Sequence, residues 1–374
     1  MSQKLRIAVV GLGFGGHFPW HKHPHCVVTA LCDTNEAALD RGADFYGCSK
    51  RYTCYQDLLS DSNVDAIALF TPAPLHASQS IAALRSGKHV CSAVPAGITL
   101  DECEELLRTV EDTGLTYMMA ETSYWRQGTI SARKFYQEGE FGEIFYCEAA
   151  YHHAGLDSLF WDSEGNRTWR HGFPPMLYPT HCTAFWVGVT GERLTEVVCV
   201  GWGDGSPVLK DNIYNNPFWN ENAFFKTERG HGFRVAIYWR GAHLGAERAE
   251  WYGDKMSFFM GHPNWGWQPV IVRTQYQTSS ANGSSVQVGT SFEIYDQPLW
   301  WKTDMLPESL RQDSGHDGSH AFIVHEFVDS IVNNRRPAID IYEALNYTVP
   351  GIIAHKSALE GGTLLKIPVY GNSR

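Results

Sequence analysis

The stretch IAVVGLGFGG at residues 7–16 joins a short apolar run to a glycine-rich turn. Gly11, Gly13 and Gly16 occupy the three glycine positions of a dinucleotide-binding fingerprint. The first glycine permits a tight turn, the second lets a pyrophosphate approach the backbone, and the third lets the next helix pack near the strand. We therefore predict a buried strand, a phosphate-binding turn that includes Phe14, and a helix whose N-terminus faces the pyrophosphate.

A second apolar run, VVTALC at residues 27–32, ends at Asp33. An acidic side chain at the end of the second strand accepts hydrogen bonds from the ribose hydroxyls of a bound dinucleotide. Its negative charge also repels a 2′-phosphate. The sequence therefore predicts NAD, rather than NADP, as the cofactor.

The composition is that of an acidic globular protein. The chain has 374 residues, enough for two domains, a net charge of -11 and a pI near 5.8. Such a chain is a poor partner for nucleic acid or an anionic membrane, and no apolar run approaches the roughly 18 residues of a membrane span. Nine cysteines without paired spacing favour reduced thiols. Residues 1–6 lead straight into the first strand, so we expect no signal peptide and a cytoplasmic location.

Residues 1–122 alternate short apolar runs with helical segments. Thr99 is followed three residues later by Glu102, which is the spacing of a helix capping box. This alternation predicts an α/β domain with a doubly wound parallel sheet. The expected strands and helices after Asp33 are helix 35–46, strand 65–70, helix 76–86, strand 89–91, a helix from residue 99, and strand 116–120.

Residues 123–374 predict an α+β domain with an open, mostly antiparallel sheet, because its apolar runs follow one another without long helices between them. Residues 203–222 are rich in Gly, Asn, Pro and Asp and predict a long loop. The expected strands are 144–151, 195–202, 233–239, 255–260 and 286–295, with late helices at 320–332 and 342–360.

The chain resembles the superfamily of glucose-fructose oxidoreductase, inositol dehydrogenase and rhizopine catabolism proteins. The likeness is most specific at residues 5–122, in the fingerprint, Asp33, TPAPLH at 71–76 and GKHV at 87–90; RRP at 335–337 and residues 346–361 are similar too. The resemblance implies an N-terminal Rossmann domain. It also implies further cofactor contacts, which are Thr71, Pro72, His76, Pro95 and Glu121. Glu121 alternatively caps the segment that follows it.

Two departures from this superfamily bear on the chemistry. Ordinary dehydrogenases follow Gly-Lys-His-Val with a Glu-Lys-Pro triad, whereas this chain has Ala93-Val94-Pro95. They also place an Asp four residues before the catalytic histidine. The matching histidine is His181, and four residues earlier lies Leu177. The chain is therefore either an inactive relative or an enzyme with different chemistry on the same cofactor.

A branch of the superfamily has such chemistry. The NAD-dependent α-N-acetylgalactosaminidases and related glycosidases carry a Val-Pro triad, and this chain is similar to them at VPA (94–96), YMMAE (117–121), YHH (151–153) and YPTH (178–181). Leu156-Asp157 departs from the branch's pattern, which puts the immediate substrate contacts in doubt. Carried over residue by residue, the likeness nominates as catalytic residues Tyr151, Tyr178 and His181, with His153 as a neighbour.

The resemblance implies glycoside hydrolysis by transient oxidation at sugar C3, elimination across C1 and C2, water addition and re-reduction. Such a site needs a proton acceptor near C2 and a donor to the C3 oxygen, and tyrosine and histidine supply both. We assign Tyr151 as the base at C2, His181 as the group at the C3 oxygen, and Tyr178 as an orienting residue. The sequence leaves an exchange of these roles open.

Four residues just before the YPTH motif are candidates for substrate binding. They are Arg167, Trp169, Arg170 and His171. Arginine suits a forked contact with an oxyanion, so a sulfonated sugar, as in the similar NAD-dependent sulfoquinovosidases, is a candidate beside N-acetylhexosaminides. The alternative is that both arginines form surface ion pairs.

Two other readings of the whole chain stay open. One is a conventional NAD-dependent sugar or polyol dehydrogenase, and the other is a non-catalytic NAD-binding protein. The histidines between His17 and His25 lack the paired spacing of a metal site, so we expect no metal. Open sheets of this type pair face to face in relatives, which favours a homo-oligomer.

Overall fold

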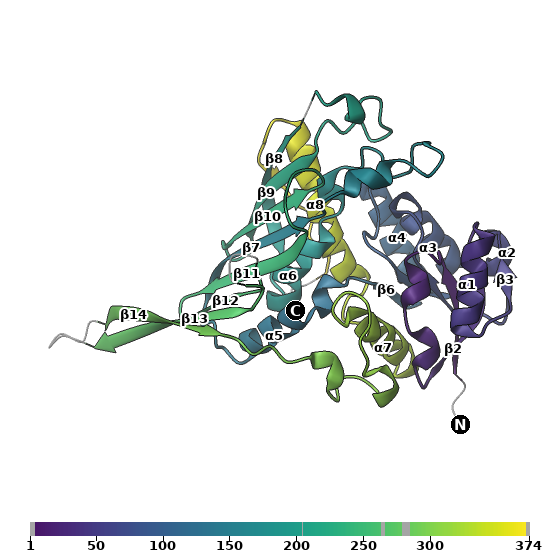
Figure 1. Ribbon diagram of the computed structural model, residues 1–374, viewed down its shortest axis with the longest axis horizontal. Coiled ribbons are helices and arrows are strands. Elements are labelled where there is room, and N and C mark those ends of the chain that lie inside the picture. Colours follow the sequence, from purple (N-terminus) through teal and green to yellow (C-terminus); the bar gives the residue numbers. More distant parts are fainter. Residues whose placement is uncertain (1–3, 204, 263–265, 279–284, 372–374) are drawn as a thin grey trace. The chain divides into compact units, whose positions relative to one another are not determined.

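The computed structural model describes residues 4–203, 205–262, 266–278 and 285–371. The chain packs into two compact units (Figure 1). Unit 1 comprises Met1–Arg126 and Leu299–Ile352, and unit 2 comprises Gln127–Pro298 and Ile353–Arg374. Within the described residues, none of the helices has the length and apolar character that crossing a membrane requires.

Unit 1 contains a six-stranded sheet in the order β3-β2-β1-β4-β5-β6, and its described neighbours all pair in parallel. This confirms the predicted doubly wound parallel sheet. The order reverses between β1 and β4, which is where such sheets bind ligands. The strands are β1 Leu5–Val10, β2 Cys26–Cys32, β3 Arg51–Tyr52, β4 Ala66–Leu69, β5 His89–Ser92 and β6 Tyr117–Met119. The helices are α1 Glu36–Tyr46, α2 Tyr55–Leu59, α3 His76–Arg85, α4 Leu100–Thr113 and α7 Ser319–Val332, with the first part of α8 Ile341–Leu359.

The ends of the unit 1 helices follow local sequence signals. Thr99 caps α4 by accepting a hydrogen bond from the Glu102 N–H, and the Glu102 side chain accepts from the Thr99 N–H, so the predicted capping box is present. α4 ends at Gly114, which adopts φ 64°. A cap of this kind stabilises a helix by about 1 kcal/mol.

The segment after the glycine-rich turn differs from the prediction. No α-helix follows it; two short 3₁₀ helices, Gly15–His17 and Trp20–Lys22, take its place. Phe18 and Trp20 are fully buried, and the Tyr46 hydroxyl donates to the Gly15 and Phe18 carbonyl oxygens at 3.0 and 2.9 Å. Carbonyl groups that a helix would use internally are therefore bound by a side chain from α1.

The chain returns to unit 1 near its end, so the boundary differs from a simple split at residue 122. Residues 299–352 pack with the Rossmann sheet rather than with unit 2. The Met119 N–H of β6 donates to the Ile339 carbonyl oxygen at 3.0 Å. The Ala96 N–H donates to the Thr348 hydroxyl at 3.2 Å. The late helices that the sequence predicts at 320–332 and 342–360 are present as α7 and α8.

Unit 2 contains a nine-stranded sheet in the order β14-β13-β12-β11-β7-β10-β9-β8-β15. β7 and β10 pair in parallel and the other described neighbours pair antiparallel, which confirms the mostly antiparallel sheet. The strands are β7 Ile144–His152, β8 Leu194–Trp202, β9 Asn220–Thr227, β10 Gly232–Tyr238, β11 Ala246–Gly253, β12 Met256–Phe259, β13 Val270–Thr278, β14 Ser285–Ile294 and β15 Leu365–Lys366. The sequence did not predict β9, β11 and β13, nor the helices α5 Gln127–Gln137 and α6 Thr180–Thr190.

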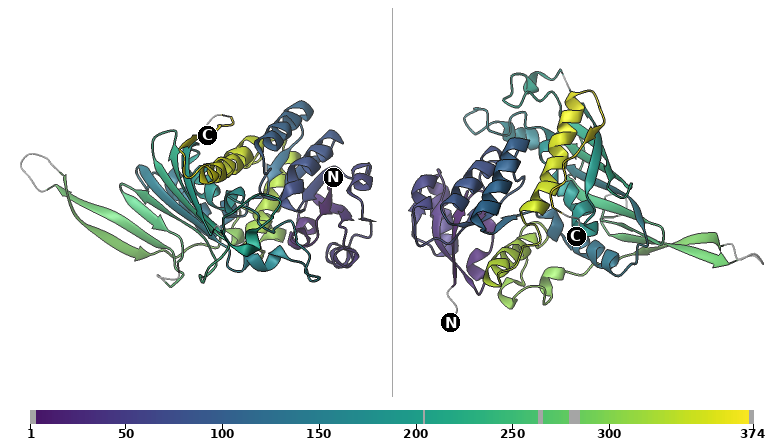
Figure 2. Two further views of the ribbon diagram at one scale, coloured as in Figure 1. Left: turned by 90° about the horizontal axis from the view of Figure 1, so that it is seen from above. Right: turned by 180° about the vertical axis from the view of Figure 1, so that it is seen from behind.

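α6 lies against one face of this sheet, and the last turns of α8 lie along the same side (Figure 2). Ten of the eleven α6 residues are buried. The Trp251 indole N–H of β11 donates to the Phe185 carbonyl oxygen of α6 at 2.9 Å. The Ser357 hydroxyl of α8 accepts from the Cys199 N–H of β8 at 2.9 Å. α6 is thus a core helix, enclosed rather than amphipathic.

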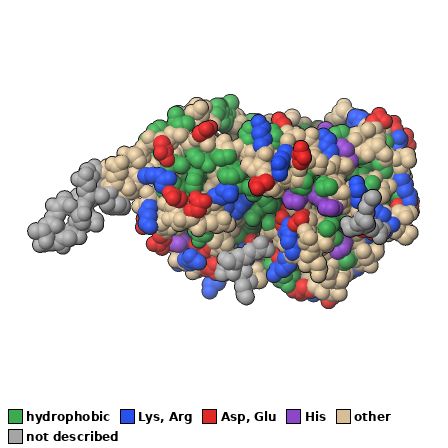
Figure 3. Space-filling view, turned by 90° about the horizontal axis from the view of Figure 1, so that it is seen from below, with side chains coloured by type: hydrophobic (Ala, Val, Ile, Leu, Met, Phe, Trp, Pro, Cys, Tyr) green, Lys and Arg blue, Asp and Glu red, His purple; other side chains and the backbone are tan. Residues whose placement is uncertain are grey.

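The opposite face of the sheet mixes apolar and charged side chains. Phe224 is 51% exposed. Beside it in register lies Arg234, which pairs with Glu148, and Arg248 pairs with Glu250 farther along the sheet. Figure 3 shows exposed hydrophobic side chains interspersed with basic and acidic ones.

His231 joins two carboxylates at the turn between β9 and β10. Its Nδ1 lies 3.0 Å from Glu192 Oε2 and its Nε2 lies 3.1 Å from Glu143 Oε1. Burial acts to lower the pKa of His231, but the hydrogen bonds to Glu192 and Glu143 outweigh it and raise the pKa above the usual 6.5. A histidine whose pKa is raised by folding stabilises the folded state while it is protonated.

We predict that His231→Gln lowers the free energy of unfolding more at pH 5.5 than at pH 9. The stabilisation is complete below the pKa of the unfolded chain and disappears as the pH rises through the raised folded-state pKa. Urea unfolding of the wild type and of His231→Gln between pH 5.5 and pH 9 measures the difference in the free energy of unfolding. An equal loss at both pH values would contradict a protonated His231.

Candidate active site

The glycine-rich turn packs tightly against β4. Gly11 has φ 82°, and a Cβ there would lie 2.5 Å from the Phe70 carbonyl oxygen. A Cβ at Gly15 would collide with the Phe70 ring, whereas one at Gly16 would lie 3.8 Å from Leu12. The glycine that permits close packing is therefore Gly15 rather than the expected Gly16.

A cavity of about 360 Å³ opens at the carboxyl ends of β1, β2 and β4. It contains the switch point of the sheet, as expected for a dinucleotide site. Gly16, His76, Pro95 and Glu121 are not among the residues that line it. Six of the predicted cofactor residues do line it, namely Gly11, Gly13, Phe14, Asp33, Thr71 and Pro72.

The polar groups at this cavity suit NAD. A Cβ at Gly13 would have no neighbour within 4 Å, so the backbone there is open to a ligand. Asp33 is half-buried and accepts hydrogen bonds from the Leu12 and Asn35 N–H groups at 2.7 and 2.9 Å. A carboxylate has about four acceptor sites, so capacity remains for ribose hydroxyls. Asp33 would hold the adenosine ribose, and the turn at Gly13 would hold the pyrophosphate.

The predicted cofactor residues that do not line this cavity have contacts within the protein. The ring of His76 joins the Thr71 and Pro95 carbonyl oxygens, at 2.7 Å from Nε2 and 2.8 Å from Nδ1. Glu121 is fully buried and accepts from the Ser123 N–H at 2.7 Å, as a cap of the following turn would. Val94 is buried. An apolar side chain thus stands where the resemblance puts a lysine.

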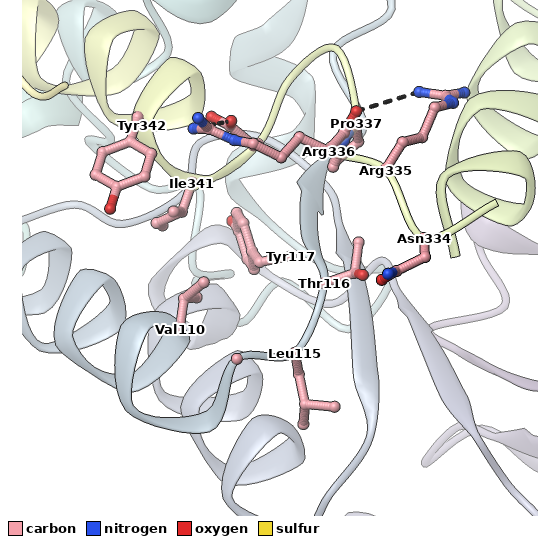
Figure 4. A pocket seen from close by; sticks show the side chains of 12 residues that line it. Val110, Leu115, Thr116, Tyr117, Asn334, Arg335, Arg336, Pro337, Ile341 and Tyr342 are labelled. Carbon is pink, nitrogen blue, oxygen red and sulfur yellow. Dashed lines mark hydrogen bonds and ion pairs between the residues drawn. The ribbon is translucent and has the colours of Figure 1, made fainter. Parts of the chain in front are cut away.

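Unit 1 has a second cavity, of about 240 Å³, between the loop at residues 334–342 and the ends of α4 and β6 (Figure 4). Its two arginines are already in ion pairs. Arg335 binds Glu326 and Asp329 at 2.7 Å each, and Arg336 pairs with Asp340. These contacts join the end of α7 to the segment that leads into α8, within the returning part of the chain.

Unit 2 brings together the predicted catalytic residues. Tyr151 is on β7 and faces α6, Tyr178 precedes α6, and His181 is in the first turn of α6. The Tyr151 and His181 ring centroids are 4.6 Å apart, and the Tyr178 ring lies 6.0 Å from Tyr151 and 5.3 Å from His181. Two phenols and one imidazole are thus within proton-transfer reach of a single small ligand.

His153 and Trp239 complete this aromatic cluster. The His153 ring lies edge-on to Tyr151 at 5.9 Å, and Trp239 does the same at 5.8 Å. Burial and the neighbouring Arg170 charge lower the pKa of His153, so the ring is neutral near pH 7. His152 points to the other face and stacks on Tyr238 at 4.3 Å. The sequence did not single out Trp239, because nothing in its local pattern separates it from other strand tryptophans.

The predicted substrate residues differ in their surroundings. Arg167 and His171 contact neighbouring parts of unit 2, whereas Arg170 acts on the aromatic cluster. The Arg167 guanidinium donates to the Asp211 carbonyl oxygen at 2.7 Å, so it holds a loop. His171 is buried beside aromatic rings, and burial followed by the Arg167 charge lowers its pKa. The Arg170 guanidinium lies over the Trp169 ring at 4.3 Å. Arg170 is the arginine of this set whose charge acts on the cluster.

His23, one of the N-terminal histidines, packs against His325 of α7. His23 Nε2 lies 3.2 Å from His325 Nδ1, and the pKa of His23 falls to about 3, mainly through burial. In the part of the chain that the structure describes, three or more His, Cys, Asp or Glu side chains nowhere converge as metal ligands would.

Comparison with known proteins identifies both ends of the chain. Residues 5–121 match the oxidoreductase family with an NAD-binding Rossmann fold, and residues 268–374 match the C-terminal domain of glycosyl hydrolase 109. Each end of the chain is therefore similar to one of these families, and each match covers less than half of the chain. It is an oxidoreductase-fold protein with an NAD cofactor.

Relatives along the whole chain agree with these matches. A glycosyl hydrolase family 109 protein of Stenotrophomonas maltophilia is 24% identical over 417 residues, covering 99% of this chain and 89% of the relative. An α-N-acetylgalactosaminidase of Shewanella oneidensis is 24% identical over 409 residues, covering 98% and 85%.

Solved structures share the fold at low identity. A levoglucosan dehydrogenase in complex with NADH has a TM-score of 0.78 at 17% identity, covering 98% of this chain and 100% of that one. An NAD-binding oxidoreductase from Klebsiella pneumoniae has a TM-score of 0.76 at 15% identity, covering 98% and 99%.

We predict that Gly13→Ala weakens NAD binding about tenfold, equivalent to about 1.4 kcal/mol, because the methyl group occupies the open approach to the turn. The folded state should change little, since that methyl group meets no protein atom. Isothermal titration with NAD and thermal unfolding without NAD measure the two effects.

Gly11→Ala is the comparison variant. A left-handed alanine costs about 1–2 kcal/mol before the contact with Phe70 is counted, so this protein should unfold at lower temperature even without NAD. Unchanged NAD affinity in Gly13→Ala would show that the pyrophosphate does not approach this turn.

Proposed function

We propose that the protein is an NAD-dependent glycosidase that oxidises its sugar transiently and releases it without net redox change. The observation that carries this proposal is the cluster of Tyr151, Tyr178 and His181 in unit 2. It offers proton donors and acceptors but no lysine, in a chain that also has an NAD cavity. The glycosyl hydrolase 109 match and relatives support it.

The two tyrosines and the histidine have distinct tasks in this proposal. Bound NAD supplies a reversible two-electron oxidant for the C3 alcohol of the sugar. A C3 carbonyl acidifies the proton on C2, and the Oη of Tyr151, in its tyrosinate form, accepts that proton. His181 holds the proton at the C3 oxygen and stabilises its developing negative charge. Tyr178, whose ring contacts both, orients His181 and the sugar.

The overall reaction balances as a hydrolysis. Removal of the C2 proton expels the aglycone from C1, and the aglycone oxygen leaves with a proton. Water adds at C1, a proton returns to C2, and C3 would be reduced again by the hydride that bound NAD had taken from it, so the products are the free sugar and an alcohol.

The finer substrate proposal is a glycoside with an anionic substituent. Arg170 is half-buried, stacks on Trp169 and influences His153. A sulfonate or carboxylate would receive forked hydrogen bonds from this guanidinium. N-acetylhexosaminides are the alternative class, which the Shewanella oneidensis relative's name favours.

Proton NMR in D₂O with a panel of glycosides tests the function. The panel contains sulfoquinovosides and N-acetylhexosaminides. We expect free sugar that carries deuterium at C2, with no net NADH. Net NADH together with a ketosugar would instead establish a conventional dehydrogenase.

We predict that Tyr151→Phe lowers kcat about 10²–10⁴-fold, which is the usual contribution of a general base. NAD affinity should be unchanged, because Tyr151 is not among the residues that line the cofactor cavity. Deuterium incorporation at C2, measured separately from aglycone release, should fall in parallel. Retained exchange at C2 would assign the base to another residue.

We predict that Arg170→Gln raises KM for an anionic glycoside about 10-fold or more while it leaves KM for a neutral glycoside within about threefold, because a charged hydrogen bond contributes about 1.5–3 kcal/mol. Arg167→Gln is the matched control, since that guanidinium holds backbone carbonyl groups. Equal effects of Arg170→Gln on both substrates would remove the anionic class.

The assembly remains a proposal as well. We expect a homo-oligomer, because the open face of the unit 2 sheet carries exposed Phe224 beside paired arginine and glutamate side chains. A second copy would present the same mixture of apolar and oppositely charged groups. Light scattering measures the molar mass.

A further inference from the structure

Glu221 is a fully buried carboxylate on β9. It lies on the same side of the strand as the buried Ala223 and Phe225, so it faces the interior. An ionised carboxylate in such a place is costly unless every oxygen is hydrogen-bonded. Its presence in an apolar strand face therefore requires partners.

Both oxygens of Glu221 have a partner. Oε1 lies 2.8 Å from Nδ1 of His355, which is in the last turns of α8 and is itself buried. Oε2 accepts a hydrogen bond from the Met176 N–H at 2.7 Å. Glu221 thus connects the part of α8 that belongs to unit 2 to the backbone of the segment that leads into α6.

That segment carries Tyr178. Met176 lies in the 3₁₀ helix Pro175–Leu177, and the next N–H beyond this helix, that of Tyr178, donates to the Pro175 carbonyl oxygen at 2.9 Å. α6 begins two residues after Tyr178, and the Cys182 N–H donates to the Pro179 carbonyl oxygen at 2.8 Å. A displacement of Met176 therefore passes through a short, hydrogen-bonded chain to the Tyr178 ring.

We infer that Glu221, held in place by His355, is a positioning residue for Tyr178 and His181. The inference rests on the proposed function, because it assigns Glu221 to the same site without contact with substrate. Displacements of about 1 Å in a positioned group cost as much as 100-fold in rate. The carboxylate acts by fixing the backbone, so an isosteric amide should replace it.

The same unit offers a matched control. Glu192 is also buried; it lies 3.0 Å from His231 Nδ1 and accepts a hydrogen bond from the Arg229 N–H at 3.1 Å. It too combines a buried carboxylate, a histidine and a backbone N–H. Its backbone partner belongs to the turn between β9 and β10, and not to the segment that carries Tyr178.

The experiment compares four variants with NAD present. Glu221→Ala removes both hydrogen bonds, Glu221→Gln keeps an acceptor for Met176, and His355→Phe removes only the histidine. Glu192→Ala is the control for the loss of a buried carboxylate. Hydrogen exchange of the peptide that covers residues 174–182 is measured together with kcat, KM and the NAD affinity of each folded variant.

We expect Glu221→Ala to accelerate amide exchange at Met176 and Tyr178 at least tenfold and to lower kcat about 30–100-fold, with NAD affinity unchanged. Glu221→Gln should stay within about threefold of the wild type in both, and His355→Phe should fall between. Glu192→Ala should lower the unfolding temperature without accelerating exchange at Met176.

Three results would overturn the inference. They are unchanged exchange at Met176 in Glu221→Ala, equal effects of Glu221→Ala and Glu192→Ala, and a Gln variant as impaired as the Ala variant. If the wild type hydrolyses no glycoside, the proposed function fails separately. The exchange comparison then still decides whether Glu221 holds the Tyr178 segment.

Discussion

The enclosure of α6 by the unit 2 sheet is the constraint on which the aromatic cluster depends. A helix that is buried on nearly all sides has no solvent-facing side along which to slide or rotate. Large side chains such as Trp186 and the Trp251–Phe185 contact fix its rotation and height against β7 and β11. His181 then has one position relative to the end of β7, where Tyr151 lies. The site is therefore a product of core packing rather than of a mobile loop.

A helix or strand can be predicted from sequence when the residues that determine it are adjacent in the chain. β4 and the capping box of α4 are specified by a few adjacent residues, and the sequence predicts both. Apolar residues do not recur at a helical period in α6, because almost all of its residues are buried. That periodicity is the signal that identifies a helix in a sequence. The strand NENAFFKT of β9 is polar at its start, and its first three residues fall in the loop that the sequence predicts at 203–222. The missing first helix depends on Tyr46, whose hydroxyl binds carbonyl groups about 30 residues away in the chain.

The same distinction applies to the candidate site. Motifs that resemble a known family nominate Tyr151, Tyr178 and His181, and the structure places these residues in one cluster. Trp239 and Glu221 reach the same region from β10 and β9 only through the register of the sheet. Register depends on many cross-strand contacts, so no short motif records it. Prediction from sequence therefore named residues that the structure places in one cluster and missed residues that pack around them.

This chain differs from the pattern of the ordinary dehydrogenases that it resembles in where it carries carboxylate and lysine side chains. A carboxylate beside an imidazole favours the charged ring, and a lysine adds a permanent cation. Here the corresponding residues, Leu177 and Val94, are both buried and apolar. A carboxylate is nevertheless present nearby. Glu221 accepts a hydrogen bond from the N–H of Met176, the residue that precedes Leu177. In the site that we propose, the Glu221 carboxylate binds the backbone that leads to Tyr178 and His181, which would leave proton transfer to tyrosine and histidine.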